Sequence, residues 1–290
     1  STYKREDNKE DNKIKLYVNG VAETINSSIQ SNNFITTSNE PLHFGALSMG
    51  DGTYNSHFDG NIDEVGIWNN ALTANEITDL YNSGKALDAR SNSGNYASTS
   101  NLVGYWKMED GSGTTLTDVS GYGNDGAIDG ASWSPGVIST SYDNTPKTIE
   151  DNEGGNALSL NGADNYVSFN QSDNHDFNNN SEATLSAWVK IDAFDPNDSN
   201  SGTQRIIAKK EGYYLAIEYF DGAPKFEARF KVNTTDAGWK DVRSTTTPVI
   251  NKWYHVVSTY KREDNKEDNK IKLYVNGVAE TINSSIQSNN

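Results

Sequence analysis

The stretch Ser258–Asn290 reads STYKREDNKEDNKIKLYVNGVAETINSSIQSNN, and Ser1–Asn33 repeats it without a mismatch. Equivalent residues of the two copies are 258 − 1 = 257 positions apart. Identity over this length indicates either a recent tandem duplication or one periodic polymer cut at an arbitrary point. The chain therefore begins with a repeat of its own end.

Each copy predicts a β-hairpin. The run Ile271-Lys-Leu-Tyr-Val-Asn-Gly-Val places Ile271, Leu273 and Val275 on one face, and the Asn-Gly pair that follows is a strong signal for a type I′ turn. Immediately upstream, Trp253–Tyr260 alternates β-branched and aromatic residues. Ser1 falls inside the equivalent of that run, so the first copy lacks the start of its leading strand.

The repeat predicts how the 290 residues divide. We expect residues 1–82 to be the C-terminal part of one repeat, 83–100 a linker rich in Ser, Asn and Gly, and 101–290 the N-terminal and central part of the next repeat. Residues 34–82 can then fold back in cis as a circular permutant, which leaves one hairpin redundant. Alternatively they complete the preceding unit, and open sheet edges recruit another chain head to tail. The second interpretation is favoured.

Composition restricts the class of partner. The formal net charge is −16 and the sequence pI is about 4.6, which argues against nucleic acid as a partner because phosphate neutralisation needs clustered Lys and Arg. The absence of cysteine excludes disulfides and thiol chemistry. No apolar run approaches the ~18 residues of a membrane span. We expect an extracellular or bacterial cell-surface location.

Many short alternating segments predict an all-β fold. In the clearest strand, Lys225–Val232, the apolar residues face the core and Lys225, Glu227 and its other charged residues face water. This strand is expected to pair with Tyr213–Phe220 across a turn at Asp221-Gly222. Thr73 and Glu76 form a capping box for one short helix. Together these elements predict an antiparallel two-sheet jelly-roll sandwich.

Several motifs, taken in the order that starts near residue 101 and wraps past the repeat, resemble one family. They are Gly104-Tyr-Trp-Lys-Met-Glu-Asp-Gly-Ser-Gly-Thr, Asp118-Val-Ser-Gly-Tyr-Gly-Asn-Asp-Gly, Asn156-Ala-Leu-Ser-Leu-Asn-Gly-Ala-Asp-Asn-Tyr-Val, Thr184-Leu-Ser-Ala-Trp-Val-Lys, Trp253-Tyr-His-Val, Leu273-Tyr-Val-Asn-Gly-Val and Phe58-Asp-Gly-Asn-Ile-Asp-Glu-Val-Gly-Ile-Trp. The series is similar to the laminin G-like, concanavalin A-like jelly-roll modules of large secreted bacterial repeat proteins. The resemblance implies the sandwich fold, and it leaves the function open because this sandwich carries many functions.

The resemblance also implies a calcium ion at one rim of the sandwich. The matching oxygen-bearing residues are Asp63, Asp118 and Asn124, with Glu109 as a weaker fourth. Loop carbonyls or water would have to complete a shell of about 6–8 oxygens. In the alternative interpretation Asp118 and Asn124 form Asx-turns and Asp63 caps a loop. A site with both Asp63 and Asp118 requires the segments on the two sides of the linker to meet.

Loop aromatics suggest a glycan-binding surface. Sugar binding needs aromatic platforms beside polar groups, and the candidates are Trp239, Tyr54 near Asp51, and Trp133. Catalysis has little support, because no Glu is followed two residues later by Asp, as a jelly-roll glucanase motif would require, and the four histidines are scattered. We therefore expect a chain that is not an enzyme.

Three functions are compatible with these observations. The favoured one is a structural or adhesive tandem repeat of a large extracellular protein that assembles head to tail into a filament, is stabilised by calcium and contacts neighbouring copies of itself. The alternative is a calcium-dependent carbohydrate-binding, lectin-like module for cell-surface or matrix glycans. The third is a non-catalytic part of a glycoside-processing enzyme.

Overall fold

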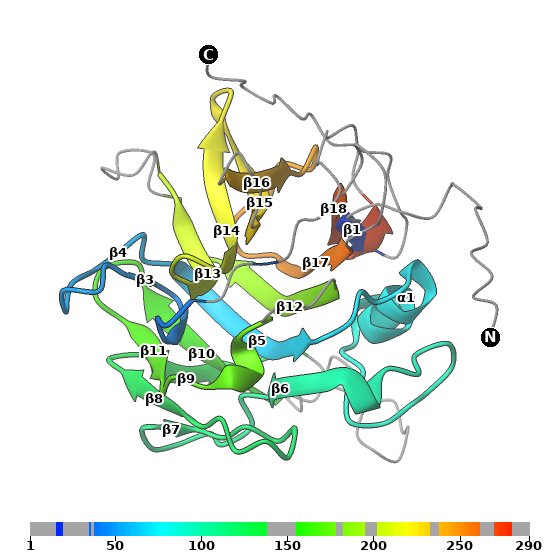
Figure 1. Ribbon diagram of the computed structural model, residues 1–290. Helices are drawn as coiled ribbons and strands as arrows, with labels where there is room; N and C mark the ends of the chain where they lie inside the picture. The colour runs from blue at the N-terminus through cyan, green and yellow to red at the C-terminus, as the bar shows by residue number, and fades with distance from the viewer. Residues whose placement is uncertain are drawn as a thin grey trace, which may run out of the picture.

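Two antiparallel β-sheets pack face to face and build the molecule (Figure 1). The computed structural model describes residues 16–19, 35, 38–137, 155–177, 182–194, 202–232, 238–261 and 270–279. The predicted all-β sandwich with one short helix is confirmed. Within the described residues no helix is long and apolar enough to cross a membrane.

The first sheet contains nine described strands, most of them antiparallel to their neighbours. In spatial order they are β1 (Leu16–Asn19), β19 (Gly277–Ala279), β18 (Lys270–Val275), β17 (Trp253–Lys261), β12 (Glu182–Ile191), β5 (Asp59–Trp68), β10 (Asn156–Asn161) and β9 (Ser132–Pro135), with β6 (Leu102–Trp106) paired to β5. The repeated hairpin thus lies at one end of this sheet.

The second sheet contains eight described strands. Their order is β16 (Gly238–Arg243), β15 (Ala223–Val232), β14 (Tyr213–Phe220), β13 (Gln204–Lys209), β2 (Leu42–Phe44), β11 (Tyr166–Phe169), β8 (Gly126–Asp129) and β7 (Thr115–Leu116). Two further short strands, β3 (Leu47–Ser48) and β4 (Tyr54–Asn55), pair with each other.

In each sheet a central strand from before residue 82 lies between two strands from after it. β5 lies between β12 and β10, and β2 lies between β13 and β11. In this single chain the two segments therefore close on one another in cis, the alternative that was not favoured from the sequence. One chain holds the strands of a whole sandwich and a second copy of one of them.

β5 shows where glycine serves close packing instead of a turn. The sequence suggests a turn at Asp59-Gly60, but β5 continues through both residues, and Gly60 pairs with Leu160 and Ile191 on either side. Gly60 has a φ of 152°, and a Cβ there would lie 2.2 Å from the carbonyl oxygen of Lys190. Glycine is required because the neighbouring backbone approaches so closely.

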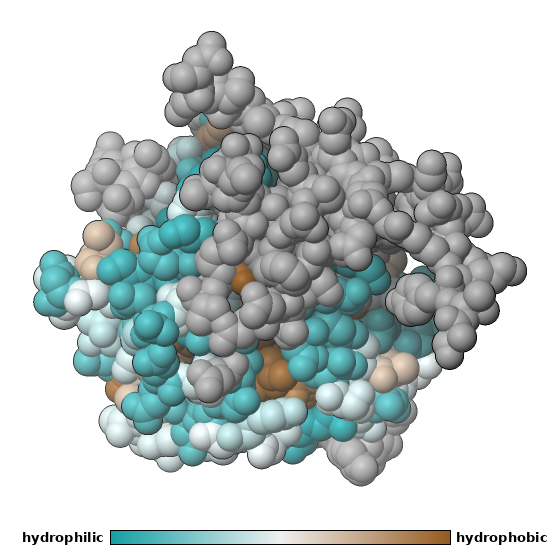
Figure 2. Space-filling view, in the orientation of Figure 1, coloured by the Kyte–Doolittle hydropathy of each residue, from teal (hydrophilic) through white to brown (hydrophobic). Residues whose placement is uncertain are grey.

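The apolar alternation of the strands creates two buried layers. The main core lies between the sheets and contains residues from nearly every strand, including Trp106, Leu185 and Leu273. A second cluster lies on the other side of the first sheet, against the helix α1 (Ala74–Tyr81), and includes Trp68 and Tyr274. The surface in Figure 2 is mostly hydrophilic over the described residues, as the high net charge requires.

α1 starts as the sequence predicts. Thr73 accepts a hydrogen bond from the backbone N–H of Glu76, and the Glu76 side chain accepts one from the backbone N–H of Thr73, which completes the capping box. Beyond the helix, the segment assigned to a linker packs closely. Tyr96 is fully buried, accepts a hydrogen bond of 3.0 Å from Trp68 Nε1 and donates one of 2.7 Å to the carbonyl of Ala89.

Candidate functional sites

The loop after β7 is held by Asp118, one of the residues predicted to bind calcium. Its carboxylate accepts hydrogen bonds of 2.9–3.0 Å from the backbone N–H groups of Tyr105, Ser120 and Asn124. The Asn124 side chain donates another, at 3.1 Å. Trp106 Nε1 donates to the Asn124 carbonyl at 3.0 Å. Asp118 and Asn124 thus meet, and they fasten the loop to β6 in the manner of the Asx-turn interpretation.

Asp63 lies apart from this pair and has its own partners. Its two oxygens accept hydrogen bonds of 2.8 Å from the backbone N–H groups of Glu64 and Val137. Burial raises the pKa of Asp63. The carboxylate of Asp118 is already occupied by four N–H donors. In this arrangement Asp63 and Asp118 have separate hydrogen-bond partners.

No metal centre is formed by the side chains in the described part of the chain. Within it, no group of three or more His, Cys, Asp or Glu side chains is placed to hold a metal ion. Calcium binding accordingly stays a prediction from the resemblance.

Replacement of Asp118 by Asn distinguishes a turn residue from a calcium ligand. Asp118→Asn removes charge-assisted hydrogen bonds to three backbone N–H groups, so we expect a loss of about 1–3 kcal/mol in the free energy of unfolding. The loss should be equal in calcium and in chelator, measured by urea unfolding. A loss that occurs only in calcium would show instead that Asp118 binds the ion.

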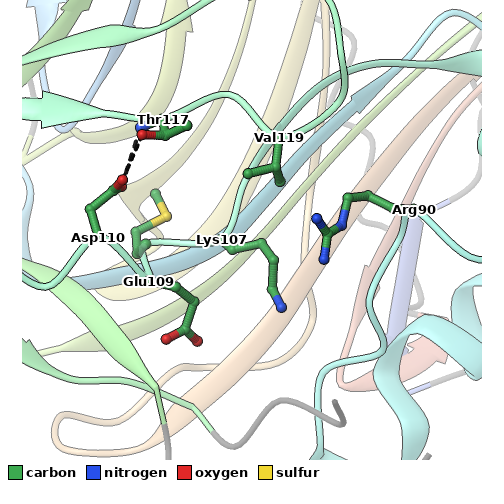
Figure 3. Close-up of a pocket in the computed structure, with 7 residues that line it drawn as sticks. Arg90, Lys107, Glu109, Asp110, Thr117 and Val119 are labelled. Atoms are coloured by element: carbon green, nitrogen blue, oxygen red, sulfur yellow. Dashed lines mark hydrogen bonds between the residues drawn. The ribbon is translucent and has the colours of Figure 1, made fainter. Parts of the chain in front are cut away.

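Glu109 borders the cavity drawn in Figure 3, which has a volume of about 280 Å³. Arg90 and Lys107 point into the same space, and both pair with the buried Asp88, at 2.6 and 3.4 Å. On the opposite wall Asp110 accepts hydrogen bonds from Thr117. Both cations are therefore already partnered, and the mixed charges of the lining favour no single ligand class.

A buried carboxyl group on β5, that of Glu64, was not predicted from the sequence. Glu64 has a φ of 48° and lies on β5 near the bulge that separates Ser186 from Trp188 on β12. Tyr105 donates a hydrogen bond to one Glu64 oxygen, while the other is buried without a partner. Burial raises the pKa of Glu64 to about 8, although the charge of Lys107 opposes this. Glu64 is therefore protonated at neutral pH.

His255 lies in the same layer and has a structural role. Its Nε2 is 2.9 Å from Ser186 Oγ, and its ring stacks on those of Trp188 and Tyr81. Burial lowers the pKa of His255 to about 3. Glu64, Ser186 and His255 line a cavity of about 10 Å³, which is the size of one water molecule. This space is too small for a substrate.

The outer face of the second sheet carries a charged and aromatic layer. Glu227, expected to face water, is buried instead, because three arginines from β13, β15 and β16 surround it. Its distances to Arg243, Arg229 and Arg205 are 3.0, 3.5 and 3.9 Å. The Arg205 guanidinium also lies 3.5 Å from the centre of the Tyr214 ring. Each cation is thus held in place by a carboxylate or an aromatic face.

Two of the predicted glycan-binding residues lie on this face. Trp239 packs against Tyr214, with ring centres 5.6 Å apart. Tyr54 stacks on Tyr166 at 4.0 Å and contacts His43, whose neighbours in β2 point into the core. Ala208 of β13 is the direct partner of both His43 and Tyr214, so these side chains lie on the same side of the sheet. The rings of Tyr54 and Trp239, which contact His43 and Tyr214, therefore lie on that side too.

The other two predicted glycan-binding residues lie elsewhere. Asp51 accepts two hydrogen bonds from Thr53 in an exposed turn. Trp133 belongs to the first sheet, where it packs against the core and donates a hydrogen bond of 3.3 Å to the carbonyl of Gly113.

Both copies of the repeated strand pair with the same edge of β17, the edge opposite β12 (Figure 1). β18 pairs antiparallel with β17 so that Val275 is opposite Val256. β1 pairs antiparallel with β17 so that Val18, the equivalent residue of the first copy, is also opposite Val256. The other edge of β17 is taken by β12. The same register for both copies defines one position, which we call the β17 slot.

β19, the strand on the other side of the β17 slot, also pairs with both copies in the same register. Tyr274 of β18 and Tyr17 of β1 both pair with Ala279 of β19. Leu16 and Leu273 are equivalent residues of the repeat and take the same place in the ladder. Because neighbouring strands lie about 4.8 Å apart, this position between β17 and β19 holds one strand at a time, and the two copies are alternative occupants of it. The remainder of the first copy lies outside the described residues.

Comparison with known proteins identifies the family. Residues 5–78 and 161–289, together more than half of the chain, match the family model described as the concanavalin A-like lectin/glucanases superfamily. Each matched segment includes most of one copy of the repeat. No curated protein and no solved structure matches the chain. The family match and the two-sheet sandwich agree, and the chain belongs to the concanavalin A-like lectin/glucanase superfamily.

Proposed function

We propose that the chain is one period of a structural or adhesive repeat in a large extracellular protein. The observation that carries the proposal is the identity of residues 1–33 and 258–290, combined with a whole sandwich in one chain. One period then supplies one sandwich, and a longer array repeats it. The proposal assigns the chain no catalytic role.

Physical arguments support a repeated module. An array whose periods fold separately presents the same surface many times, which raises the strength of weak contacts with a cell or matrix. A net charge of −16 per chain keeps such units apart and soluble. Stability without disulfides relies on the two apolar layers.

A chain with one more period tests this function. Joining residues 1–257 to the N-terminus of the present chain gives two periods. We expect the calorimetric unfolding enthalpy to about double while the melting temperature changes by only a few degrees, because each period folds as its own cooperative unit. An enthalpy that stays at the value for one period would contradict the proposal, because the added period would then not fold.

A second candidate function is carbohydrate binding on the outer face of the second sheet. The observation that favours it is that two partly exposed aromatic residues lie on one sheet face. Trp239 packs on Tyr214, which Arg229 also contacts, and Tyr54 stacks on Tyr166 farther along the sheet. Aromatic rings with fixed polar neighbours are suited to sugar rings. Glycan-array binding that Trp239→Ala abolishes, and Trp133→Ala preserves, would support this function, and no binding by the wild type would refute it.

A further inference from the structure

We propose that the β17 slot is a docking site for the repeated strand of a second copy of this chain, so that neighbouring copies exchange hairpins. The inference rests on the proposed function, and it names the partner and the surface through which periods connect. It differs from completion of a half-built unit, because the sandwich is already closed in cis. What links two copies is a spare strand that fits a position already in use.

The slot is built to hold this one sequence. Leu273 and Val275 of its occupant are buried in the main core, and Tyr274 is buried in the layer against α1. An incoming copy of the strand has the same side chains in the same order, Leu16-Tyr-Val. It can therefore bury the same apolar groups and form the same ladder hydrogen bonds as the strand it replaces. Other sequences would not combine this register with two apolar faces.

The slot admits a single strand, whereas the chain carries two. β12 occupies one edge of β17 along Val256–Ser258, so only the other edge is available. When one copy occupies this edge, the other copy cannot pair with β17 of the same chain in that register, and its alternating apolar residues can then pair with the same edge of another chain. Every chain is then a donor of one strand and the owner of one slot.

A strand from a second chain forms the same contacts as the strand that it replaces. The extent of strand exchange therefore depends on the concentration of the competing strand. A tethered strand has an effective concentration in the millimolar range for a short flexible connection. Separate chains must approach that concentration to compete, whereas neighbouring periods of one array are already tethered. We therefore expect exchange to be dominant between adjacent periods and to rise with concentration between free chains.

Disulfide trapping between full-length chains tests the proposal. The wild-type chain has no cysteine, so one preparation with Val18→Cys and another with Val256→Cys each carry a single thiol. Val18 and Val256 are direct antiparallel partners, a pairing that brings their Cα atoms within the range of a disulfide. The two preparations are mixed, oxidised, and examined by mass spectrometry for a peptide pair joined through positions 18 and 256.

We expect the mixed dimer to form and its yield to rise with chain concentration. The matched control replaces Val256→Cys by Val167→Cys, an equally buried residue of β11 that pairs with β2 and β8 and not with the repeated strand. A yield equal to this control at every concentration up to the millimolar range would overturn the proposal. The pair Tyr17→Cys and Val257→Cys repeats the test at the neighbouring position of the ladder if a first variant is poorly folded.

This result and the test of the proposed function are independent. If the enthalpy doubles in the two-period chain but no mixed dimer forms, the chain is a repeat whose periods do not exchange strands. If the enthalpy does not double but the mixed dimer forms, the proposal that the β17 slot binds a second copy is supported and the proposal of a repeat array is contradicted.

Discussion

A chain with Leu273→Asp should unfold with nearly the wild-type free energy, whereas Leu16→Asp/Leu273→Asp should lose about 3–5 kcal/mol or more. Leu273 is fully buried in the main core, so a carboxylate there removes β18 from the slot. β1 then takes its place, because Leu16 is the equivalent residue in the same register on β17. Only when both copies are damaged does the slot lose its apolar occupant.

Occupation of the β17 slot by β1 instead of β18 lowers the free energy of unfolding slightly. Residues 20–41 connect β1 to β2, whereas only residues 262–269 separate β17 from β18. The longer connection raises the entropy cost of closing the loop by about 1 kcal/mol. Leu16→Asp alone should have almost no effect, since β18 already fills the slot.

Urea unfolding of the three variants measures this non-additivity directly. The control is Leu185→Asp on β12, a core leucine that is equally buried and occurs once in the chain. This single substitution should cost as much as the double variant. If Leu273→Asp alone is already as unstable as Leu185→Asp, the first copy cannot replace the second, and the account of one slot with two occupants is wrong.

Glu64→Gln should stabilise the protein at pH 9 and change its stability little at pH 5. The carboxyl is buried, and its pKa rises from 4.5 to about 8. Between these values the folded chain keeps a proton that the unfolded chain has released, so the free energy of unfolding falls as pH rises and levels off above 8. The shift corresponds to a loss on the order of 3–5 kcal/mol, which a neutral Gln avoids.

The comparison with Glu64→Gln cancels groups that titrate alike in both proteins, such as Glu227, whose pKa burial raises to about 7. Asp63 contributes to the difference, because burial and then Glu64 raise its pKa. Burial lowers the pKa values of His43, His175 and His255, so their contribution is lost as pH falls below 6.5 and they do not act between pH 7 and 9. Glu40→Gln, at a partly exposed carboxyl, is the matched control. Denaturant unfolding from pH 5 to 9 that gives parallel curves for wild type and Glu64→Gln would contradict a protonated Glu64.

Much of the fold follows from local patterns in the sequence. The Asn276-Gly277 and Asp221-Gly222 turns are present with positive φ at both residues of each pair, and they join the strands that the alternation predicts. The capping box of Thr73 and Glu76 starts α1. These features depend on residues close together in the chain, so their physical causes are visible without a structure.

Features that depend on the packing of distant strands could not be predicted. Alternation places Glu227 on the outer face correctly, but its burial depends on Arg205 and Arg243, which the sheet register brings from other strands. In the same way, Asp118 is a plausible calcium ligand in the sequence, and its backbone donors are known only from the fold. In the sequence, nothing distinguishes the buried Glu64 from an exposed polar residue on a strand.

The duplicated hairpin is the clearest case of this limit. Its identity in two places is visible in the sequence, and the sequence also suggests that residues 34–82 belong to the preceding unit. In the single chain these residues lie in the middle of both sheets, because β5 and β2 have partners on each side. Local sequence patterns do not show whether a strand pairs within its own chain or with the identical strand's partners in a neighbouring unit.

The most direct test of one slot with two occupants uses a chain with three cysteines, Val18→Cys, Val256→Cys and Val275→Cys. The cysteine at 256 can pair with either of the others, which are equivalent residues of the repeat. After oxidation at low concentration, mass spectrometry of the monomer should find both the 18–256 and the 256–275 disulfide. Detection of the 256–275 bridge alone would mean that β18 holds the slot exclusively, and it would contradict the account.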